Sequence, residues 1–289
     1  MSVYHTPVLL DESVSALNIK PDGVYVDATF GGGGHSGEIL SRLGSKGVLV
    51  AFDRDEEALA NVPEDSRLIP VHGDFRFVHN FLRYHRLNVA DGILADLGVS
   101  SHQFDTEERG FSFRFEGAPL DMRMNRLTQK TARDVVNSYS GEELERIFKL
   151  YGEVDNSRRV AELICSSRER KSIETTDDLG RAIDSVLPKL LEHKYLAKIY
   201  QALRIEVNGE MASLEGFMDG AVKSLGPGGR LAVITYHSLE DRIVKNSIRT
   251  ACEAGLLKRV VKKPILPSEE EIASNTRARS AKLRIAEKV

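Results

Sequence analysis

The sequence predicts an α/β fold in which a mostly parallel sheet is interrupted by a long helical insertion. Four short apolar segments, each ending in glycine or an acidic residue, alternate with helix-like segments through the first hundred residues. Such alternation is typical of βαβ units, whose consecutive strands run parallel. Roughly a hundred residues without a convincing buried strand follow. A further apolar strand then appears after a glycine-rich turn, so the sheet is expected to combine two separate stretches of chain.

The strands and helices can be placed in order along the chain from their apolar patterns. We expect strands at residues 23–29, 47–53, 67–71, 92–97, 230–235, 257–261 and 282–286. Helices are expected at residues 35–43, 56–61, 75–87, 211–225 and 239–253. Seven strands, with a helix and a terminal strand after the fifth, are typical of the seven-stranded Rossmann-like variant.

The interruption after the fourth strand predicts an inserted domain. Amphipathic segments such as residues 142–150 lie in it, and none of its segments reads as a buried strand. We therefore expect residues 104–208 to form a helical substrate-recognition domain. Residues 1–103 and 209–289 are expected to form the sheet domain together.

Composition and cysteine usage limit the class of protein. Of the 289 residues, 41% are hydrophobic and 29% are charged, which is ordinary for a globular protein. No segment approaches the roughly 20 apolar residues that a membrane helix needs. Cys165 and Cys252 lie far apart, without a CxxC motif or clustered histidines. We therefore expect a cytoplasmic protein with no membrane partner and no metal site.

The strongest local motif is a run of four glycines at 31–34, directly after the first strand and before a helix. Glycine lets the backbone approach a ligand that any Cβ would obstruct. Asp53 ends the second strand 26 positions after Asp27. Rossmann-like sites place an acid at about this spacing, where it accepts hydrogen bonds from ribose hydroxyls. The two features together predict a site for a cofactor that carries a nucleoside.

The next two strands also end in residues that suit such a site. Phe75 follows the third strand, where an adenine is expected, and Asp96 ends the fourth. Ligands of open α/β sheets bind beyond the carboxyl ends of the strands, so the four strand ends are expected to line one crevice. For Asp96, capping of its own loop is the structural alternative.

Three classes of protein remain open at this point. An NAD-dependent dehydrogenase would use the same glycine loop and Asp53, but no hydride-transfer site is recognisable. A non-catalytic RNA-binding or ribosome-assembly factor would account for a basic C-terminal segment but not for the glycine loop. The pattern of the C-terminal half fits the sheet of a class I methyltransferase that depends on S-adenosylmethionine.

Two segments carry residues suited to RNA. Residues 104–126 interleave phenylalanines with arginines, a mixture that single-stranded RNA recognition uses. Alternatively, the phenylalanines anchor the insertion onto the sheet and the arginines pair with nearby acids. Residues 258–288 contain nine Lys or Arg against four Glu, which suits phosphate or simply a solvated face. The expected RNA contacts are Arg109, Arg123, Arg126, Arg277 and Arg279.

Distinctive segments recur along the chain in a specific order and spacing. They are HTPVLL at 5–10, TFGGGGHS at 29–36, DGILADLGVSS at 91–101, ERGFSF at 108–113, PLDMRM at 119–124, YGE at 151–153, QALRI at 201–205, VN at 207–208, HSLEDR at 237–242 and RARSAKLR at 277–284. With these segments the sequence resembles, over nearly its whole length, the bacterial 16S ribosomal RNA cytosine-N4 methyltransferases, the MraW or RsmH family. Two segments depart from the family pattern: KYLAKIY at 194–200 replaces a sequence of the His-Pro-Ala-Thr-Arg type, and Thr276 replaces the usual proline.

The resemblance implies a cofactor, a substrate and a set of site residues. The implied substrate is the N4 amine of a cytosine in 16S ribosomal RNA of the small ribosomal subunit, and the sequence leaves a homodimer open. The implied cofactor is S-adenosyl-L-methionine, bound by Gly33, Gly34, His35, Asp53, Phe75, Asp96 and Gln103.

Transfer of a methyl group to an exocyclic amine requires an acceptor for the amine hydrogen. Such an acceptor helps localise the nitrogen lone pair, which is otherwise delocalised into the base. Asp96 stands where related amino-methyltransferases keep an acceptor, and His237, after the fifth strand, is the second candidate catalytic residue. The structural alternative for His237 is that it fixes its loop through Glu240 or Asp241.

Overall fold

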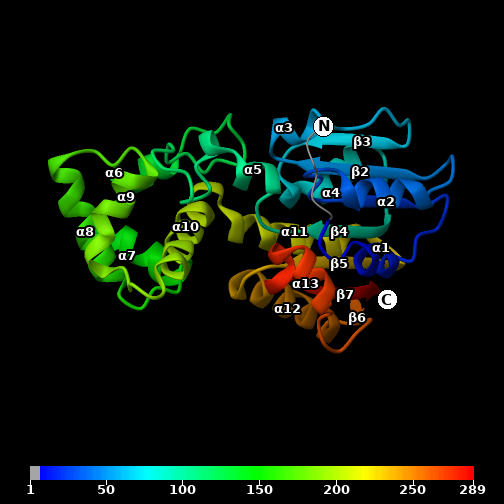
Figure 1. Cartoon of the computed structure of the whole chain (residues 1–289). Helices are drawn as coiled ribbons and strands as arrows, with labels where there is room; N and C mark the ends of the chain where they lie inside the picture. The colour runs from blue at the N-terminus through cyan, green and yellow to red at the C-terminus, as the bar shows by residue number, and fades with distance from the viewer. Residues whose placement is uncertain (1–6) are drawn as a thin grey trace. The chain divides into compact units, whose positions relative to one another are not determined.

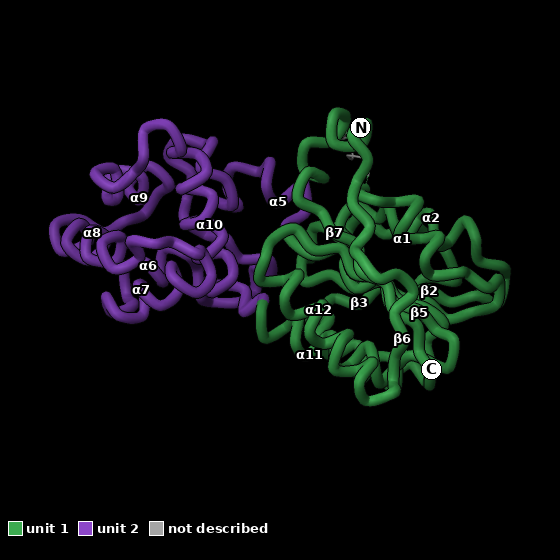
Figure 2. Tube along the Cα trace, turned by 90° about the horizontal axis from the view of Figure 1, so that it is seen from below, with its two compact units in different colours: residues 1–98, 211–289 green, residues 99–210 purple. Residues whose placement is uncertain are grey.

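The computed structural model describes residues 7–289, which divide into two compact units. The sheet unit comprises residues 1–98 and 211–289, and the helical unit comprises residues 99–210 (Figure 2). The helical unit begins five residues before and ends two residues after the expected insertion, 104–208. His5 and Thr6, which begin the motif at 5–10, lie outside the described residues. No helix within the described range is long and apolar enough to cross a membrane.

The described part of the sheet unit contains a seven-stranded sheet in the order β3-β2-β1-β4-β5-β7-β6. The first five strands run parallel, and β7 is antiparallel to both β5 and β6. All the expected strands form, and the predicted Rossmann-like α/β fold is confirmed. The strands are β1 Val24–Asp27, β2 Val48–Asp53, β3 Leu68–His72, β4 Ala90–Asp96, β5 Leu225–Thr235, β6 Leu257–Arg259 and β7 Lys282–Lys288.

The order of the strands reverses beside β1. The chain moves outward from β1 to β2 and β3, then returns to place β4 on the other side of β1. In open α/β sheets the crevice at this switch point, beyond the carboxyl ends of the strands, is where ligands bind.

The one clear difference in strand bounds is at β5, which begins at Leu225 instead of the expected residue 230. Leu225 pairs with Ala90, but Arg230 already pairs with Gly92, so the register shifts across the glycine-rich turn. The turn at 226–229 is therefore a bulge inside the strand, not a loop before it.

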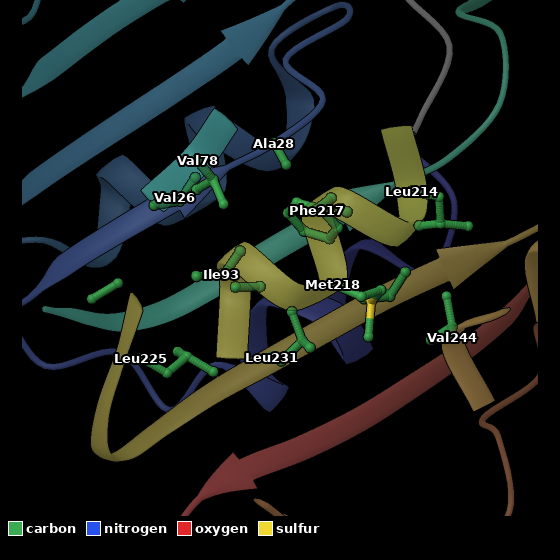
Figure 3. Packing of buried hydrophobic residues seen from close by; sticks show 14 of the residues in the cluster. Val26, Ala28, Val78, Ile93, Leu214, Phe217, Met218, Leu225, Leu231 and Val244 are labelled. Atoms are coloured by element: carbon green, nitrogen blue, oxygen red, sulfur yellow. The ribbon is translucent and has the colours of Figure 1, made fainter. Parts of the chain in front are cut away.

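Helices cover both faces of the sheet, as Figure 1 shows. One hydrophobic core joins α4, α11 and α12 to strand residues such as Val50 and Ile93; Figure 3 shows Phe217 and Met218 of α11 in it. A second core joins α1 and α2 to alternating residues such as Leu49 and Leu94. The helices of this unit are α1 Leu10–Ala16, α2 Gly34–Arg42, α3 Glu56–Leu59, α4 Val78–Tyr84, α11 Glu210–Ser224, α12 Ser238–Glu253 and α13 Glu269–Ser274, with the short 3₁₀ helices η1 Phe75–Phe77 and η4 Thr276–Ser280.

The helical unit has its own hydrophobic core. Its described residues contain no strand, only an isolated bridge between Pro119 and Thr175. Capping boxes start several of its helices; Ser140 and Glu143 form the one at α7. The helices are α5 Ser101–Asp105, α6 Ala132–Ser138, α7 Gly141–Leu150, α8 Ser157–Arg170, α9 Thr176–Ile183 and α10 Glu192–Asn208, with 3₁₀ helices η2 Glu107–Arg109 and η3 Asp184–Val186.

Candidate active site

The glycine run forms a tight turn between β1 and α2. Gly31 and Gly33 have φ angles of 52° and 78°, in the left-handed region that favours glycine. The Phe30 N–H donates to the Phe52 carbonyl oxygen at 2.8 Å, and the Gly31 N–H donates to Asp53 Oδ2, also at 2.8 Å. These bonds hold a turn without side chains against the end of β2, which is the cradle that a cofactor with a ribose requires.

Asp27 and Thr29 fix the first part of this turn. The buried Asp27 carboxylate accepts hydrogen bonds from the Thr29 N–H at 3.0 Å and from the Ser36 hydroxyl at 2.6 Å. Thr29 Oγ1 in turn accepts the N–H of Asp96 at 2.7 Å. The loop is thereby tied to α2 and to the end of β4. Sequence reasoning used Asp27 only to measure spacing and did not assign it this role.

Asp53 lies where the sequence predicts a ribose ligand, but its carboxylate also organises the backbone. Besides Gly31, it accepts the N–H of Asp55 at 2.8 Å. Burial raises the pKa of Asp53 to about 6, although these two backbone bonds favour the charged form. The carboxylate is a hydrogen-bond acceptor without a lysine or arginine partner among the described residues.

Phe75 follows β3 in η1 and lies partly buried. Its ring packs edge-on against Phe217 of α11, with 5.1 Å between the ring centroids. The Arg54 guanidinium lies 5.2 Å from the centroid of the Phe75 ring and forms an ion pair with Asp74 at 2.9 Å. The aromatic side chain is therefore held at the sheet edge, in the place expected for adenine recognition.

Asp96 ends β4, next to the glycine turn. Its Oδ1 accepts the Tyr236 hydroxyl at 2.7 Å, and its Oδ2 lies 3.9 Å from Nδ1 of the buried His35. Burial raises the pKa of Asp96 to about 6, against the lowering effects of His35 and the Tyr236 hydrogen bond. The side chain keeps 23% of its surface exposed. A carboxylate with these properties can accept a proton near neutral pH.

His35 belongs to the same cluster. Its Nε2 lies 3.2 Å from the Val8 carbonyl oxygen, which orients the ring. The structure thus brings together, at one edge of the sheet, six of the residues expected to bind the cofactor: Gly33, Gly34, His35, Asp53, Phe75 and Asp96.

Gln103 and His237 have local roles in the structure. Gln103, in the helical unit, accepts the Ser100 N–H at 3.2 Å in the capping box of α5. His237 is the N-cap of α12, and its Nε2 lies 3.1 Å from Oε1 of the buried Glu240. The structural alternative that the sequence left open for His237 is present, so a catalytic role for this residue stays a prediction.

The arginines expected to bind RNA fall into two groups. Arg109 requires a correction: its side chain is 1% exposed and donates to the carbonyl oxygens of Arg123 and Met124, so its guanidinium is not available at the surface. Arg123 is bonded to Asp121 at 2.7 Å. Arg277 is partly buried. The exposed members of the set are Arg126 and Arg279.

Three of the phenylalanines interleaved with these arginines, Phe104, Phe111 and Phe113, pack in the helical unit's core. Phe111 is buried there, and Phe113 packs against the Tyr200 ring with 5.4 Å between centroids. Their packing supports the alternative in which these phenylalanines are structural. The core that they join belongs to the insertion itself.

Tyr236 is the site residue that sequence reasoning missed. It directly follows β5, the strand beside β4. The rule that located Asp53, Phe75 and Asp96, which searches the residues just after each parallel strand, selected the neighbouring His237 at the end of β5; the hydroxyl of Tyr236 in the same position was the signal that could have found it.

The chain is similar to known proteins over nearly its full length. A sequence model of the MraW methylase family matches residues 2–289. A protein of Bacteroides fragilis named ribosomal RNA small subunit methyltransferase H is 54% identical, covering 99% of this chain and 98% of the relative. Proteins of the same name from Parabacteroides distasonis and Flavobacterium johnsoniae are each 52% identical, over 100% and 99% of this chain respectively and 98% of each relative.

Proposed function

Because the chain belongs to the MraW methylase family, we propose that it methylates the N4 amine of a cytosine in 16S ribosomal RNA of the small ribosomal subunit, with S-adenosylmethionine as methyl donor. The names of its relatives support a small-subunit ribosomal RNA substrate. The observation that carries the chemistry is Asp96, a carboxylate with a raised pKa beside the glycine turn.

The residues at the carboxyl edge of the sheet fit S-adenosylmethionine. The turn at 31–34 has no side chain to obstruct a ligand, Asp53 offers a carboxylate for ribose hydroxyls, and Phe75 offers a ring for the adenine. Gln103 belongs to the helical unit, and its contact with the cofactor stays a prediction. When bound, S-adenosylmethionine supplies a methyl group on a positively charged sulfur, which a nucleophilic nitrogen can take.

Asp96 provides an acceptor for the amine hydrogen. The lone pair of a cytosine amine is delocalised into the ring, so the nitrogen gains nucleophilicity when an acceptor draws on its N–H. Because the pKa of Asp96 is about 6, the side chain is mostly ionised at neutral pH and still basic enough to take the proton after transfer. His35 lies close to the same carboxylate and favours its ionised form.

Methylation at carbon 5 of the base is the rival reaction, and the cysteines argue against it. That reaction needs a nucleophile that adds covalently to the ring, a role that thiolates commonly fill. Cys165 lies in α8 and Cys252 in α12, and neither follows the end of a strand. An exocyclic amine as acceptor requires only the proton acceptor that Asp96 provides.

Recognition of the RNA is assigned to the helical unit and to the basic C-terminal segment. The exposed Arg126 and Arg279 are the strongest candidates for phosphate contacts, and Arg123 and Arg277 are less accessible. Phosphate contacts fix the position of the RNA without reading its sequence.

The test is nucleoside mass spectrometry of small-subunit RNA from cells with and without this protein. We expect one N4-methylated cytidine to disappear in its absence. The methyl group should return when purified protein and S-adenosylmethionine are added to the unmodified subunits. A product methylated at carbon 5 or on the ribose would refute the proposed substrate atom.

A further inference from the structure

We propose that Tyr236 is a positioning residue, which occupies one oxygen of Asp96 and so commits the other oxygen to the substrate amine. The inference rests on the proposed function, because it assigns an orientation to the carboxylate that accepts the proton. Tyr236 lies outside the segments that resemble the family, and it was not among the site residues expected from the sequence.

The contact joins two adjacent parallel strands at their carboxyl ends. Asp96 pairs in register with Ile234 of β5, and the Leu97 N–H donates to the Ile234 carbonyl oxygen at 3.0 Å. Tyr236 comes two residues later, and its hydroxyl donates to Asp96 Oδ1 at 2.7 Å. The strand register therefore sets the distance between the two side chains, although 140 positions separate them in the sequence.

Tyr236 is itself held firmly. Its N–H donates to Oε2 of Glu240 at 2.8 Å, and Glu240 is buried in the first turn of α12. The ring packs against the core on the α1 and α2 face of the sheet. It also lies beside Gly98, where φ is 104° and a Cβ would come within 3.5 Å of the ring. A side chain fixed at backbone and ring cannot follow a rotating carboxylate, so it defines the orientation of Asp96.

The phenol acts as a donor throughout the working pH range. Burial and the nearby carboxylates, Asp96 first among them, raise the pKa of Tyr236 well above its usual value. Asp96 Oδ1 is therefore always hydrogen-bonded. Asp96 Oδ2 lies 3.9 Å from His35 Nδ1, beyond hydrogen-bond distance, and is the oxygen left to accept a proton.

Four groups, three of them in named elements and one in the loop after β5, bear on the charge of Asp96. His35 of α2 and the Tyr236 hydroxyl favour the ionised form, whereas Asp27 of β1 and Glu240 of α12 oppose it. Replacing Tyr236 by phenylalanine removes a hydrogen bond to the charged form only. The pKa of Asp96 must then rise, and the pH below which methyl transfer fails must rise with it.

The experiment compares the wild type with Tyr236→Phe in two measurements. Carbon-13 NMR titration of the aspartate carboxyls in the free protein gives the pKa of Asp96, assigned with Asp96→Asn. Single-turnover methyl transfer to small subunits between pH 5 and 9 gives the acid limb. We expect both midpoints to move upward together, and the rate on the plateau to fall roughly tenfold, as the loss of one hydrogen bond to a charged group would produce.

Tyr25→Phe is the matched control. Tyr25 is also buried, and its hydroxyl accepts a backbone hydrogen bond from Lys20 at 2.8 Å, but it has no contact with Asp96. This variant should leave the pKa of Asp96 and the acid limb unchanged. An equal shift in both variants would show a general structural effect and overturn the positioning role.

The outcomes separate this inference from the proposed function. An unchanged pKa of Asp96 in Tyr236→Phe overturns the inference even if the protein methylates RNA. If Asp96→Asn methylates normally, the proton-accepting role of Asp96 fails, and with it the catalytic part of the inference, whatever the NMR titration shows. Should Tyr236→Phe fail to fold, Asp96→Asn tests the contact from the other side: it must lower the pKa of Tyr236, measured by tyrosinate absorbance.

Discussion

Two acidic residues of the sheet unit and two of the helical unit differ in how their charges are compensated. In the sheet unit, burial raises the pKa of Asp53 and of Asp96 to about 6, and no described Lys or Arg side chain pairs with either. In the helical unit, hydrogen bonds from Thr131 lower the pKa of Asp134. Burial of Asp178 is outweighed by its bonds from Arg181, the Glu174 N–H, Lys171 and Thr175, so its pKa is also lowered.

The contrast separates acids that build the fold from acids that are available for chemistry. Asp134 and Asp178 complete the capping boxes of α6 and α9, which is an ordinary stabilising use of a carboxylate. Asp53 and Asp96 stand at strand ends with their ionised forms disfavoured. Proteins tolerate such local costs mainly at functional sites.

The largest expected effect is on catalysis at Asp96. We expect Asp96→Asn to slow single-turnover methyl transfer by about 10² to 10⁴-fold, because the amide cannot take the amine proton. RNA affinity should be nearly unchanged. The comparison must be made at saturating S-adenosylmethionine, since Asp96 is also expected to contact the cofactor.

A second aspartate of β4 provides the control for this variant. Asp91 lies at the opposite end of the strand and pairs with Lys20 at 2.8 Å. Asp91→Asn should therefore transfer methyl groups at the wild-type rate. Normal transfer by Asp96→Asn itself would remove Asp96 from the chemistry and weaken the contrast between the two pairs of acids.

The next effect is on cofactor affinity. Asp53→Ala removes a charge-assisted acceptor for the ribose hydroxyls, so S-adenosylmethionine binding should weaken by roughly 1.5 to 3 kcal/mol. Isothermal calorimetry measures this directly. The variant also loses the acceptor for the Gly31 and Asp55 N–H groups, so its folding must be verified by circular dichroism.

Asp65 is a suitable control because it lies just before β3, at the end of the strand away from the candidate site, and pairs with Arg67. Asp65→Ala should bind S-adenosylmethionine as the wild type does. Unchanged affinity in folded Asp53→Ala would show that Asp53 serves only the loop.

The two kinds of acid should affect stability in opposite directions. A carboxyl whose pKa is raised on folding favours the folded state at low pH, and this contribution is lost as pH rises from about 4 to about 6. At pH 8 the wild type bears the full cost of ionised Asp96. Asp96→Asn should therefore be more stable than wild type at pH 8, by at most about 3 kcal/mol, with a smaller difference at pH 4.

Asp178→Ala should show the reverse. It removes the capping box of α9 and the bonds from Lys171 and Arg181, so we expect a loss of about 1 to 2 kcal/mol at pH 8. The loss should shrink only below about pH 4, because a carboxylate with a lowered pKa contributes stability that is lost as pH falls from the unfolded pKa toward the folded one. Urea unfolding of Asp96→Asn at pH 4 and pH 8, and of Asp178→Ala at pH 2 and pH 8, measures the two trends. Parallel trends would contradict the distinction drawn between the two pairs of acids.

The smallest expected effect is on RNA binding by a single exposed arginine. Arg126→Ala should weaken binding of small-subunit RNA modestly and reduce the slope of log affinity against log salt concentration by about one. Wild-type S-adenosylmethionine affinity should hardly respond to salt. Arg109→Ala is the informative contrast: because Arg109 is buried, it should lower thermal stability instead. An unchanged salt slope in Arg126→Ala would remove this residue from the RNA interface.

Local patterns in the sequence determined most of the architecture. Apolar runs of strand length located all the strands of the described sheet, because a strand buried on both faces must be continuously apolar. The glycine run and the strand-end acids located the candidate cofactor site, because strand direction alone brings carboxyl ends of parallel strands to one edge. The helical insertion was recognisable from the missing strands, and the structure begins it only five residues earlier.

Tertiary structure alone decided which polar side chains are paired. The sequence does not reveal that Arg109 is buried against backbone carbonyl oxygens, or that His237 is engaged by Glu240. Nor does it reveal that Tyr236 reaches Asp96 across 140 positions. Such contacts depend on strand register and on side-chain burial, which are properties of the packed sheet and its helices and not of any local stretch of residues.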